Sequence, residues 1–250
     1  MRRIFAAVAI VCAAAAAAHA GNMQILTADI PPMAFMKDGR VTGYCVDIVR
    51  EIQRRIGSGT EIELQPWARA YRSALEGENV LLVCPKRTPD REARFKWVGP
   101  LFTSQTNFYA RPADHVRIRS LEDAKKLSGV LAPRDFYSYQ YLSDAGFTNL
   151  EPTNNTLTML RMLLGGRRPV MVLDHRQLQP LLEEAGAHPE QVEMVYTAFT
   201  IGSYLSFPRQ APAELVAQWQ RALDKMKQDG AFARIYRQWY QEAPPPDVMK

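Results

Sequence analysis

Residues 80–91 read VLLVCPKRTPDR, an apolar run followed by polar and basic residues. The first four residues, Val80 to Val83, form a short apolar run, as a strand buried inside an α/β sheet does. From Cys84 onward the residues are mostly polar or basic, which marks the end of that strand. In open α/β sheets, ligands bind beyond the carboxyl ends of the strands. The residues after Val83 are therefore candidates for a binding cleft.

Similar apolar runs alternate with amphipathic stretches along the chain, a pattern that predicts parallel strands joined by crossover helices. In the first unit we expect strands at 23–28, 61–64 and 80–83, with helices at 45–56 and 68–75. The pattern then restarts, with strands expected at 129–132 and 169–173 and helices at 137–145 and 156–164. The sequence therefore predicts an α/β protein with two units.

The last third breaks this alternation. An extended piece at 194–207 precedes two long helices, 213–228 and 231–241. Pro212 stands just before the first helix and Gly230 just before the second. Extended segments near 106–110 and 195–201 bracket the second unit. We therefore expect the chain to cross between the units twice.

The first 20 residues have the layout of a secretory signal peptide. Arg2 and Arg3 precede an alanine-rich run from Ile4 to Ala18, and Ala18-His19-Ala20 supplies a small-x-small cleavage site. The run is shorter than the roughly 20 residues that span a bilayer. An uncleaved anchor helix is the alternative, and Cys12 lacks the small preceding residue of a lipid-attachment site. We therefore expect a soluble mature protein in the periplasm.

The charge of the mature chain gives little support to nucleic-acid or membrane binding. Removing the leader takes away two of the 31 basic residues and none of the 26 acidic ones, so the net charge falls from +5 to +3. Basic and acidic residues alternate along the helices and form no basic stripe. We therefore expect no nucleic-acid partner.

Export also changes the expected state of the cysteines, because only Cys45 and Cys84 follow the cleavage site. An oxidising compartment lets two thiols pair, and a disulfide closing a loop of about 40 residues stabilises by roughly 4 kcal/mol in the chain-entropy model. Two separate buried thiols are the alternative. We expect no metal and no cofactor, since the histidines show no ligand spacing with either cysteine.

Several segments together resemble the bacterial extracellular solute-binding proteins of the amino-acid type, family 3. These segments are 31–32 through 43–47 (PP…GYCVD), 87–92 (RTPDRE), 95–100 (FKWVGP) and the closing 230–239 (GAFARIYRQW). They occur in a consistent order over nearly all of the mature chain. The resemblance implies a type II periplasmic-binding-protein fold, with lobe 1 formed by residues 21–109 and 199–250 and lobe 2 by the inserted residues 110–198.

The resemblance also implies two ligand anchors. Arg91 matches the arginine that grips the ligand carboxylate, and a guanidinium offers a planar fork for two charge-assisted bonds. Asp174 matches the acidic residue that accepts hydrogen bonds from the ligand ammonium. The alternatives are a solvated helix-end charge for Arg91 and a helix N-cap for Asp174, and one carboxylate can both cap and bind.

Other candidates for the cleft come from the same resemblance and from the strand ends. Trp67 is expected to form an aromatic wall against the ligand, with a core or hinge role as the alternative. Arg134 matches a polar contact from lobe 2, and Tyr137 and Ser138 follow it around the turn. Asp29 ends the first strand. All five are predicted to bind ligand.

The sequence departs from the family just before the arginine segment. A small residue and then Ser or Thr are usual there, whereas this chain has Cys84 and Lys86. A lysine in the pocket favours an acidic ligand or one with an extra anionic group, unless Lys86 points to solvent. A disulfide between Cys45 and Cys84 would tie the first helix to the pocket floor.

Three functional classes fit these features. The leading one is a monomeric binding protein that closes its lobes on an amino acid or related carboxylate and delivers it to the permease of an ABC transporter. The second is a sensory or accessory binding protein with no transport role. The third is a dehydratase of prephenate or arogenate type, for which Asp29, Asp174 and His175 are the available acids and bases. No catalytic motif favours it, so we expect no enzyme activity.

Overall fold

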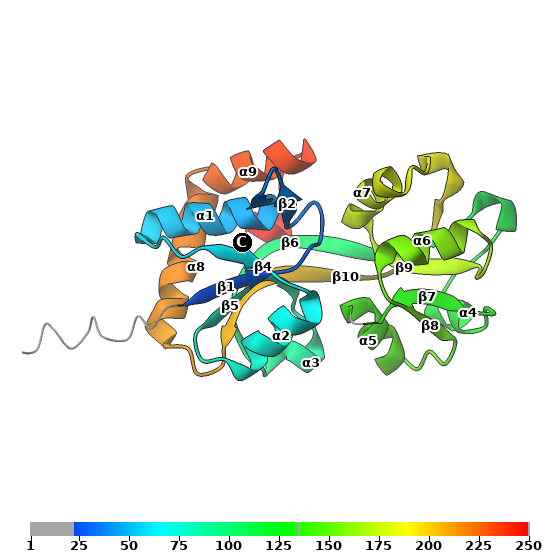
Figure 1. Cartoon of the computed structure of the whole chain (residues 1–250), viewed down its shortest axis with the longest axis horizontal. Helices are drawn as coiled ribbons and strands as arrows, with labels where there is room; N and C mark the ends of the chain where they lie inside the picture. The colour runs from blue at the N-terminus through cyan, green and yellow to red at the C-terminus, as the bar shows by residue number, and fades with distance from the viewer. Residues whose placement is uncertain (1–22, 135, 250) are drawn as a thin grey trace, which may run out of the picture.

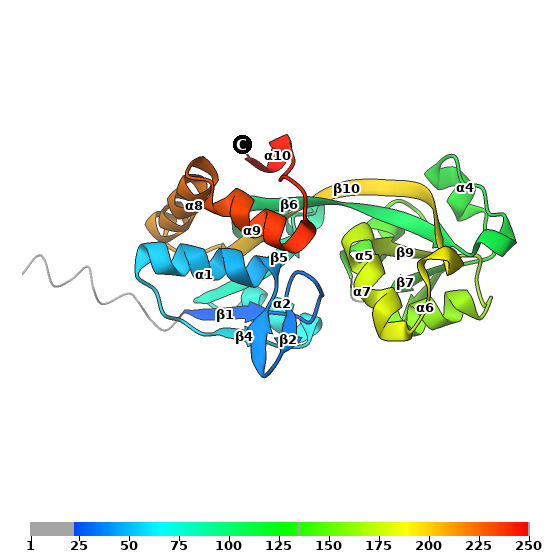
Figure 2. The ribbon, with the colours of Figure 1, turned by 90° about the horizontal axis from the view of Figure 1, so that it is seen from above.

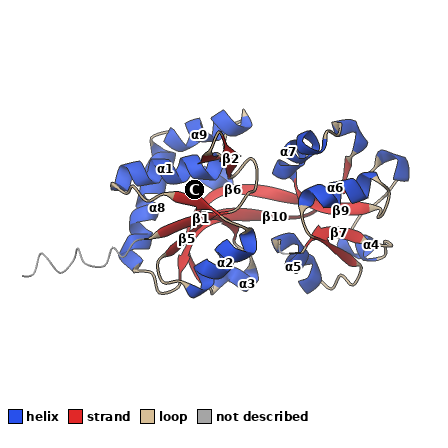
Figure 3. Ribbon diagram, in the orientation of Figure 1, coloured by secondary structure: helices blue, strands red, loops and turns tan. Residues whose placement is uncertain are grey.

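Helices flank both faces of one long twisted sheet (Figure 3) in the computed structural model, which describes residues 23–134 and 136–249. Within this part of the chain, the sheet has eight strands in the order β4-β1-β5-β10-β6-β9-β7-β8. The strands of this sheet are β1 (Gln24–Thr27), β4 (Ile62–Leu64), β5 (Val80–Lys86), β6 (Phe95–Ala110), β7 (Val130–Pro133), β8 (Leu150–Thr153), β9 (Val170–Asp174) and β10 (Glu193–Pro208). The helices are α1 (Tyr44–Ile56), α2 (Trp67–Glu76), α3 (Pro89–Glu92), α4 (Leu121–Lys125), α5 (Tyr137–Asp144), α6 (Thr156–Leu164), α7 (His175–Ala185), α8 (Ala213–Gln228), α9 (Ala231–Tyr240) and α10 (Pro246–Met249).

The expected two-unit α/β fold is confirmed, with each parallel set at one end of the sheet. β1 pairs in parallel with β4 and β5, and β7 pairs in parallel with β8 and β9. The two sixteen-residue strands β6 and β10 lie between the sets and run antiparallel to each other and to their outer neighbours. The sheet is therefore mixed, with parallel pairs within each lobe and antiparallel pairs in its middle.

β6 and β10 connect the two lobes (Figure 1). The lobe with α1, α2, α8 and α9 lies at one end of these strands, and the lobe with α4 to α7 lies at the other. The view from above shows the same two strands as the bridge (Figure 2). The two expected crossings are therefore β6 and β10.

The core of the first lobe follows the period-two alternation of β5. Leu81 and Val83 face the cluster under α1, α8 and α9, whereas Val80 and Leu82 face the smaller cluster under α2. Both faces of the strand are covered, and all of β5 is buried. A strand covered on both sides reads as a continuous apolar run, as in the sequence.

The second lobe repeats this arrangement on β7 and β9. Val130 and Val170 pack in a cluster with Leu142 of α5, whereas Leu131 and Met171 pack on the opposite face among residues of α6 and α7. The same alternation therefore builds a core on each face of the sheet in both lobes.

An edge strand and a small hairpin are among the elements that the apolar runs did not reveal, as are α4 and α7. β8 is a half-exposed edge strand that contains Pro152, a residue that edge strands tolerate because one side of their backbone is unpaired. The small hairpin of β2 (Phe35–Lys37) and β3 (Arg40–Thr42) turns at Asp38-Gly39, and both turn residues have positive φ. Asp-Gly is a strong signal for such a turn.

A β-bulge at Cys84-Pro85 changes the direction of the side chains at the end of β5. Ser203 of β10 pairs with Lys86 and Leu205 pairs with Val83, so Cys84 and Pro85 together oppose one residue. Cys84 has a φ of 63°, which bends the strand. As a result, Val83 and Cys84 both face the cluster under α1 despite being adjacent in sequence.

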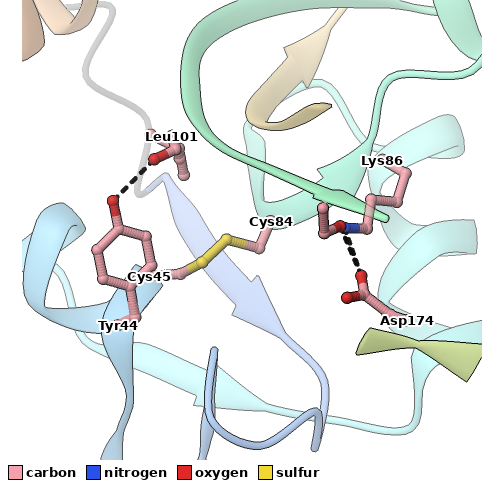
Figure 4. The surroundings of a disulfide bond; sticks show 7 residues. Tyr44, Cys45, Cys84, Lys86, Leu101 and Asp174 are labelled. Carbon is pink, nitrogen blue, oxygen red and sulfur yellow. Dashed lines mark hydrogen bonds and ion pairs between the residues drawn. A yellow bond between two sulfur atoms is a disulfide. The ribbon is translucent and has the colours of Figure 1, made fainter. Parts of the chain in front are cut away.

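This bulge brings Cys84 to Cys45 in the first turn of α1, and the two form a disulfide (Figure 4). Their Cα atoms lie 6.3 Å apart. Gly43, just before α1, has a φ of 134°, and a Cβ there would lie 2.3 Å from the Met33 carbonyl oxygen. The start of α1 is thus held tightly against the preceding loop as well as against β5. The predicted disulfide is confirmed.

The expected signal peptide, residues 1–20, lies outside the described residues. Among residues 23–134 and 136–249, no helix is long and apolar enough to cross a membrane.

The disulfide should contribute strongly to stability. Replacing both cysteines, C45A/C84A, should lower the free energy of unfolding by about 4 kcal/mol, because the denatured chain regains the entropy of an open loop. For a mature chain of this size that corresponds to a melting temperature lower by roughly 8–16 °C. Differential scanning calorimetry with and without reductant tests this. Reductant should lower the melting temperature of the wild type and leave that of the variant unchanged; a wild type insensitive to reductant would contradict the prediction.

Candidate functional site

A small pocket, with a cavity volume of about 40 Å³, lies between the lobes at the carboxyl ends of β5 and β9. Most of its wall is apolar or aromatic, and its few polar groups come from both lobes. Its lining comprises Ile30, Met33, Trp67, Cys84, Lys86, Arg91, Phe102, Phe136, Tyr137, Asp174, Gln177 and Ser203. Such a concave site with few convergent polar groups is typical of small-ligand binding.

A buried ion pair joins the lobes beside this pocket. The ammonium of Lys86, at the end of β5, lies 2.7 Å from Oδ2 of Asp174, at the end of β9. Lys86 is 6% exposed and Asp174 is 3% exposed. Figure 4 shows the ammonium facing the carboxylate, close to the disulfide. The structure thus places Lys86 in the pocket, away from solvent.

The Asp174 carboxylate has a partner for each of its oxygens. Oδ2 lies beside the Lys86 ammonium and accepts hydrogen bonds from the Ser104 hydroxyl at 2.7 Å and from the Tyr137 hydroxyl at 3.4 Å, while Oδ1 accepts the Arg176 backbone N–H at 3.1 Å. The Lys86 ammonium also donates to the Ser104 hydroxyl. The bond from the Arg176 N–H caps α7, so Asp174 both caps and faces the cleft. Burial favours the neutral acid, yet the Lys86 ammonium and the hydrogen bonds from Ser104 and Arg176 hold the pKa of Asp174 below its usual range.

Arg91, from α3, supplies a second buried cation in the pocket wall. Its guanidinium carbon lies 4.8 Å from the ring centroid of Tyr71 and 5.4 Å from that of Trp67. Its Nη1 is buried and has no hydrogen-bond partner among the described residues. Burial lowers the pKa of Arg91, but an arginine stays protonated at neutral pH. The pocket therefore presents a charged donor group that is ready to bind an acceptor.

Some pocket groups come from strands in which the sequence showed only extended structure. Ser203 of β10 is fully buried, and its hydroxyl has no hydrogen-bond partner among the described residues. The Ser104 hydroxyl of β6 donates a hydrogen bond to Asp174. The ring centroid of Phe102, also in β6, lies 4.6 Å from the Lys86 ammonium nitrogen. The polar run 103–107 (TSQTN) inside β6 is a signal that could have identified Ser104, whereas Ser203 follows Ile201-Gly202 in a more apolar stretch of β10.

Of the other predicted site residues, the structure brings only some into the pocket. Trp67 and Tyr137 line it, and the Tyr137 hydroxyl lies 2.7 Å from the Thr106 hydroxyl. Arg134 is exposed and lines a neighbouring groove that shares Trp67 and Arg91 with the pocket. Ser138 is buried in the first turn of α5, outside the pocket lining, and Asp29 is exposed outside it.

A second contact between the lobes involves Arg176 of α7. Its Nη2 donates to the Tyr236 hydroxyl of α9 at 2.6 Å, and its guanidinium carbon lies 4.1 Å from the ring centroid of Tyr240. Together with the Lys86–Asp174 pair, this contact holds α7 against the first lobe.

The described residues hold no group of three or more His, Cys, Asp or Glu suited to a metal ion. Among the acid–base candidates, Asp174 is paired with Lys86 and Asp29 lies outside the pocket. His175 accepts the Gln105 backbone N–H at its Nδ1, and burial lowers its pKa. The buried pocket groups without a hydrogen-bond partner among the described residues, Arg91 Nη1 and the Ser203 hydroxyl, are hydrogen-bonding groups.

The ion pair should make stability depend on pH. Because the pKa of Asp174 is lower in the folded protein than the roughly 3.9 of an unfolded Asp, its contribution is present above pH 4 and is lost as the pH falls through the folded value. Urea unfolding between pH 3 and 6 should show the wild type losing stability relative to K86M/D174N as the pH falls below about 4. If the free energy of unfolding changes with pH in the same way in both proteins, the pair does not have this role.

Comparison with known proteins places these features in a family. Residues 24–242 match the bacterial extracellular solute-binding proteins, family 3. The chain is 24% identical over 215 residues to the L-cystine-binding protein TcyA of Bacillus subtilis, an alignment that covers 84% of this chain and 75% of that protein.

Solved structures with the same fold include binding and sensor proteins. A histidine kinase sensor domain with similarity to periplasmic binding proteins has a TM-score of 0.79 at 21% identity, covering 90% of this chain and 98% of that one. The arginine-, lysine-, histidine-binding protein ArtJ of Geobacillus stearothermophilus has a TM-score of 0.75 at 16% identity, covering 91% and 99%. These likenesses confirm the type II periplasmic-binding-protein fold. Because the family match extends over most of the sequence, the chain belongs to the bacterial extracellular solute-binding proteins, family 3.

Proposed function

We propose that this solute-binding protein works in the periplasm, after removal of its signal peptide, and captures an amino acid or related small carboxylate for the permease of an ABC transporter. The observation that carries the proposal is the buried Arg91 guanidinium in the pocket wall, whose Nη1 has no hydrogen-bond partner within residues 23–134 and 136–249. A planar guanidinium fork binds a carboxylate through two parallel charge-assisted bonds. The names of TcyA and ArtJ, which bind amino acids, support the ligand class.

Capture would work by closure of the lobes around β6 and β10. In this proposal residues 21–109 and 199–250 move as one lobe against residues 110–198. Pocket groups come from both sides, with Arg91 and Trp67 on one lobe and Phe136 and Tyr137 on the other. A ligand shifts the balance toward closure because only the closed form lets both lobes contact it. The protein acts as a monomer and catalyses no reaction.

A sensory role is the second candidate, and the likeness to a histidine kinase sensor domain favours it. Both roles use the same pocket. They differ in the partner that recognises the closed form, a permease for transport or a receptor for sensing. Uptake of a labelled ligand in cells that lack this protein separates them. Loss of uptake supports transport, whereas unchanged uptake with an altered transcriptional response supports sensing.

Ligand class can be tested by thermal shift on the mature protein with a panel of amino acids and small carboxylates. A ligand at 100 times its dissociation constant stabilises the folded state by about 2.7 kcal/mol. We expect at least one member of the panel to raise the melting temperature. Incubation with prephenate and arogenate should yield no product, and product formation would instead support the dehydratase alternative.

Arg91 should dominate the affinity for a ligand found in this way. R91A removes two charge-assisted bonds of about 1.5 kcal/mol each, so binding should weaken by roughly 100-fold in isothermal titration calorimetry. R91K keeps the charge but loses the fork, and its affinity should lie between those of wild type and R91A. R69A is the matched control, since Arg69 is exposed on α2 and outside the pocket lining. An R91A affinity within about twofold of wild type would exclude the carboxylate role.

A further inference from the structure

The pocket carboxylate that could receive a ligand ammonium is already occupied by the protein's own ammonium. Lys86 lies 2.7 Å from Asp174, and both side chains are almost completely buried. Ser104 donates to the same oxygen, and the Arg176 N–H donates to the other. To take the place at Oδ2 of Asp174, a ligand ammonium would have to displace Lys86. That would leave a buried lysine without its counter-charge, which is strongly unfavourable.

The charges lining the pocket therefore do not suit a zwitterion. Among the described lining residues, Lys86 and Arg91 are the cations and Asp174 is the one carboxylate. Since Lys86 neutralises Asp174, one positive charge is left, on Arg91. The other described lining groups are apolar, aromatic or neutral. Such a pocket complements one negative charge on an apolar body.

Ser203 offers a further polar contact in the pocket. Its hydroxyl is buried beside Lys86 in the sheet register, lines the pocket and has no hydrogen-bond partner among the described residues. A hydroxyl can donate a hydrogen bond to a keto or hydroxyl oxygen, and its own oxygen can also accept one from an ammonium, so Ser203 suits a 2-oxygen without by itself excluding an α-ammonium. An oxygen in place of the α-ammonium would therefore give Ser203 an acceptor.

We infer that the ligand is a small apolar 2-oxo or 2-hydroxy monocarboxylate that carries no α-ammonium. Its carboxylate binds Arg91, its 2-oxygen accepts a hydrogen bond from Ser203, and its apolar body lies among the aromatic and aliphatic residues of the wall. This inference rests on the proposed carboxylate-binding function and narrows it. In this arrangement Lys86 replaces the ligand ammonium as the partner of Asp174.

Matched pairs of ligands that differ only at the α-carbon test the inference. Isothermal titration calorimetry would compare phenylpyruvate with L-phenylalanine, 4-methyl-2-oxopentanoate with L-leucine, and 4-methylthio-2-oxobutanoate with L-methionine. For the pair whose side chain fits best, we expect the 2-oxo acid to bind at least tenfold more tightly to the wild type. Equal binding, or tighter binding of the amino acid, would overturn the inference while leaving the carboxylate-binding function intact.

Two variants show whether Lys86 is the cause of this preference. K86M frees Asp174 to accept an ammonium, so the preference for the 2-oxo acid should shrink by tenfold or reverse. K86M/D174N is the control, because it removes both charges and should retain the wild-type preference; circular dichroism checks that both variants fold. An unchanged preference in folded K86M would overturn the inference. Binding of neither member of any pair, when the wider panel contains a ligand, would overturn the inference of an apolar ligand; the proposed function itself fails only if no member of that wider panel binds.

S203A provides an independent check on the 2-oxygen. It should weaken binding of phenylpyruvate severalfold and leave that of 3-phenylpropionate, which has no 2-oxygen, nearly unchanged. An equal effect on both compounds would remove the role assigned to Ser203.

Discussion

The antiparallel pairing of β6 with β10 holds the two lobes and the pocket between them in one arrangement. Each strand has sixteen residues, and together they join the parallel strands of the two lobes into one sheet. Ser203 of β10 pairs with Lys86, and Thr106 of β6 pairs with Asp174. The carboxyl ends of β5 and β9 therefore lie at the same level of the sheet, on either side of β10 and β6. Any change in this register would separate the ion pair and the pocket groups around it.

The bulge at the end of β5 is the local feature that makes use of this frame. Without the extra residue, the period-two alternation would direct Val83 and Cys84 to opposite faces of the sheet. With it, Cys84 reaches Cys45 under α1. Lys86 then extends into the cleft toward Asp174. The bulge thus allows both contacts. Cys84 forms the disulfide with α1 of the first lobe, and Lys86 forms the ion pair with Asp174 of the second lobe.

Much of the fold follows from local pattern. The runs at 80–83 and 169–173 became β5 and β9, and the helices predicted at 156–164 and 213–228 match α6 and α8. The misses have physical reasons. β8 is a half-exposed strand with Pro152, so its apolar signal is weak, and β6 begins at Phe95, well before the expected extended segment at 106–110. Apolar and polar residues do not alternate regularly along β6, because bulges interrupt its pairing with β10.

By itself, the sequence determined the α/β class, the family and the candidate anchors Arg91 and Asp174, because periodicity and motif order are properties of neighbouring residues. It also showed that Lys86 departs from the family pattern, but it left open whether that side chain enters the pocket or points to solvent. Only the tertiary structure decided this. Lys86 and Asp174 lie 88 positions apart in the sequence, and their contact exists because β10 and β6 align the ends of β5 and β9. A buried charge is stable only beside its partner, and which residues become partners is set by the non-local pairing of strands.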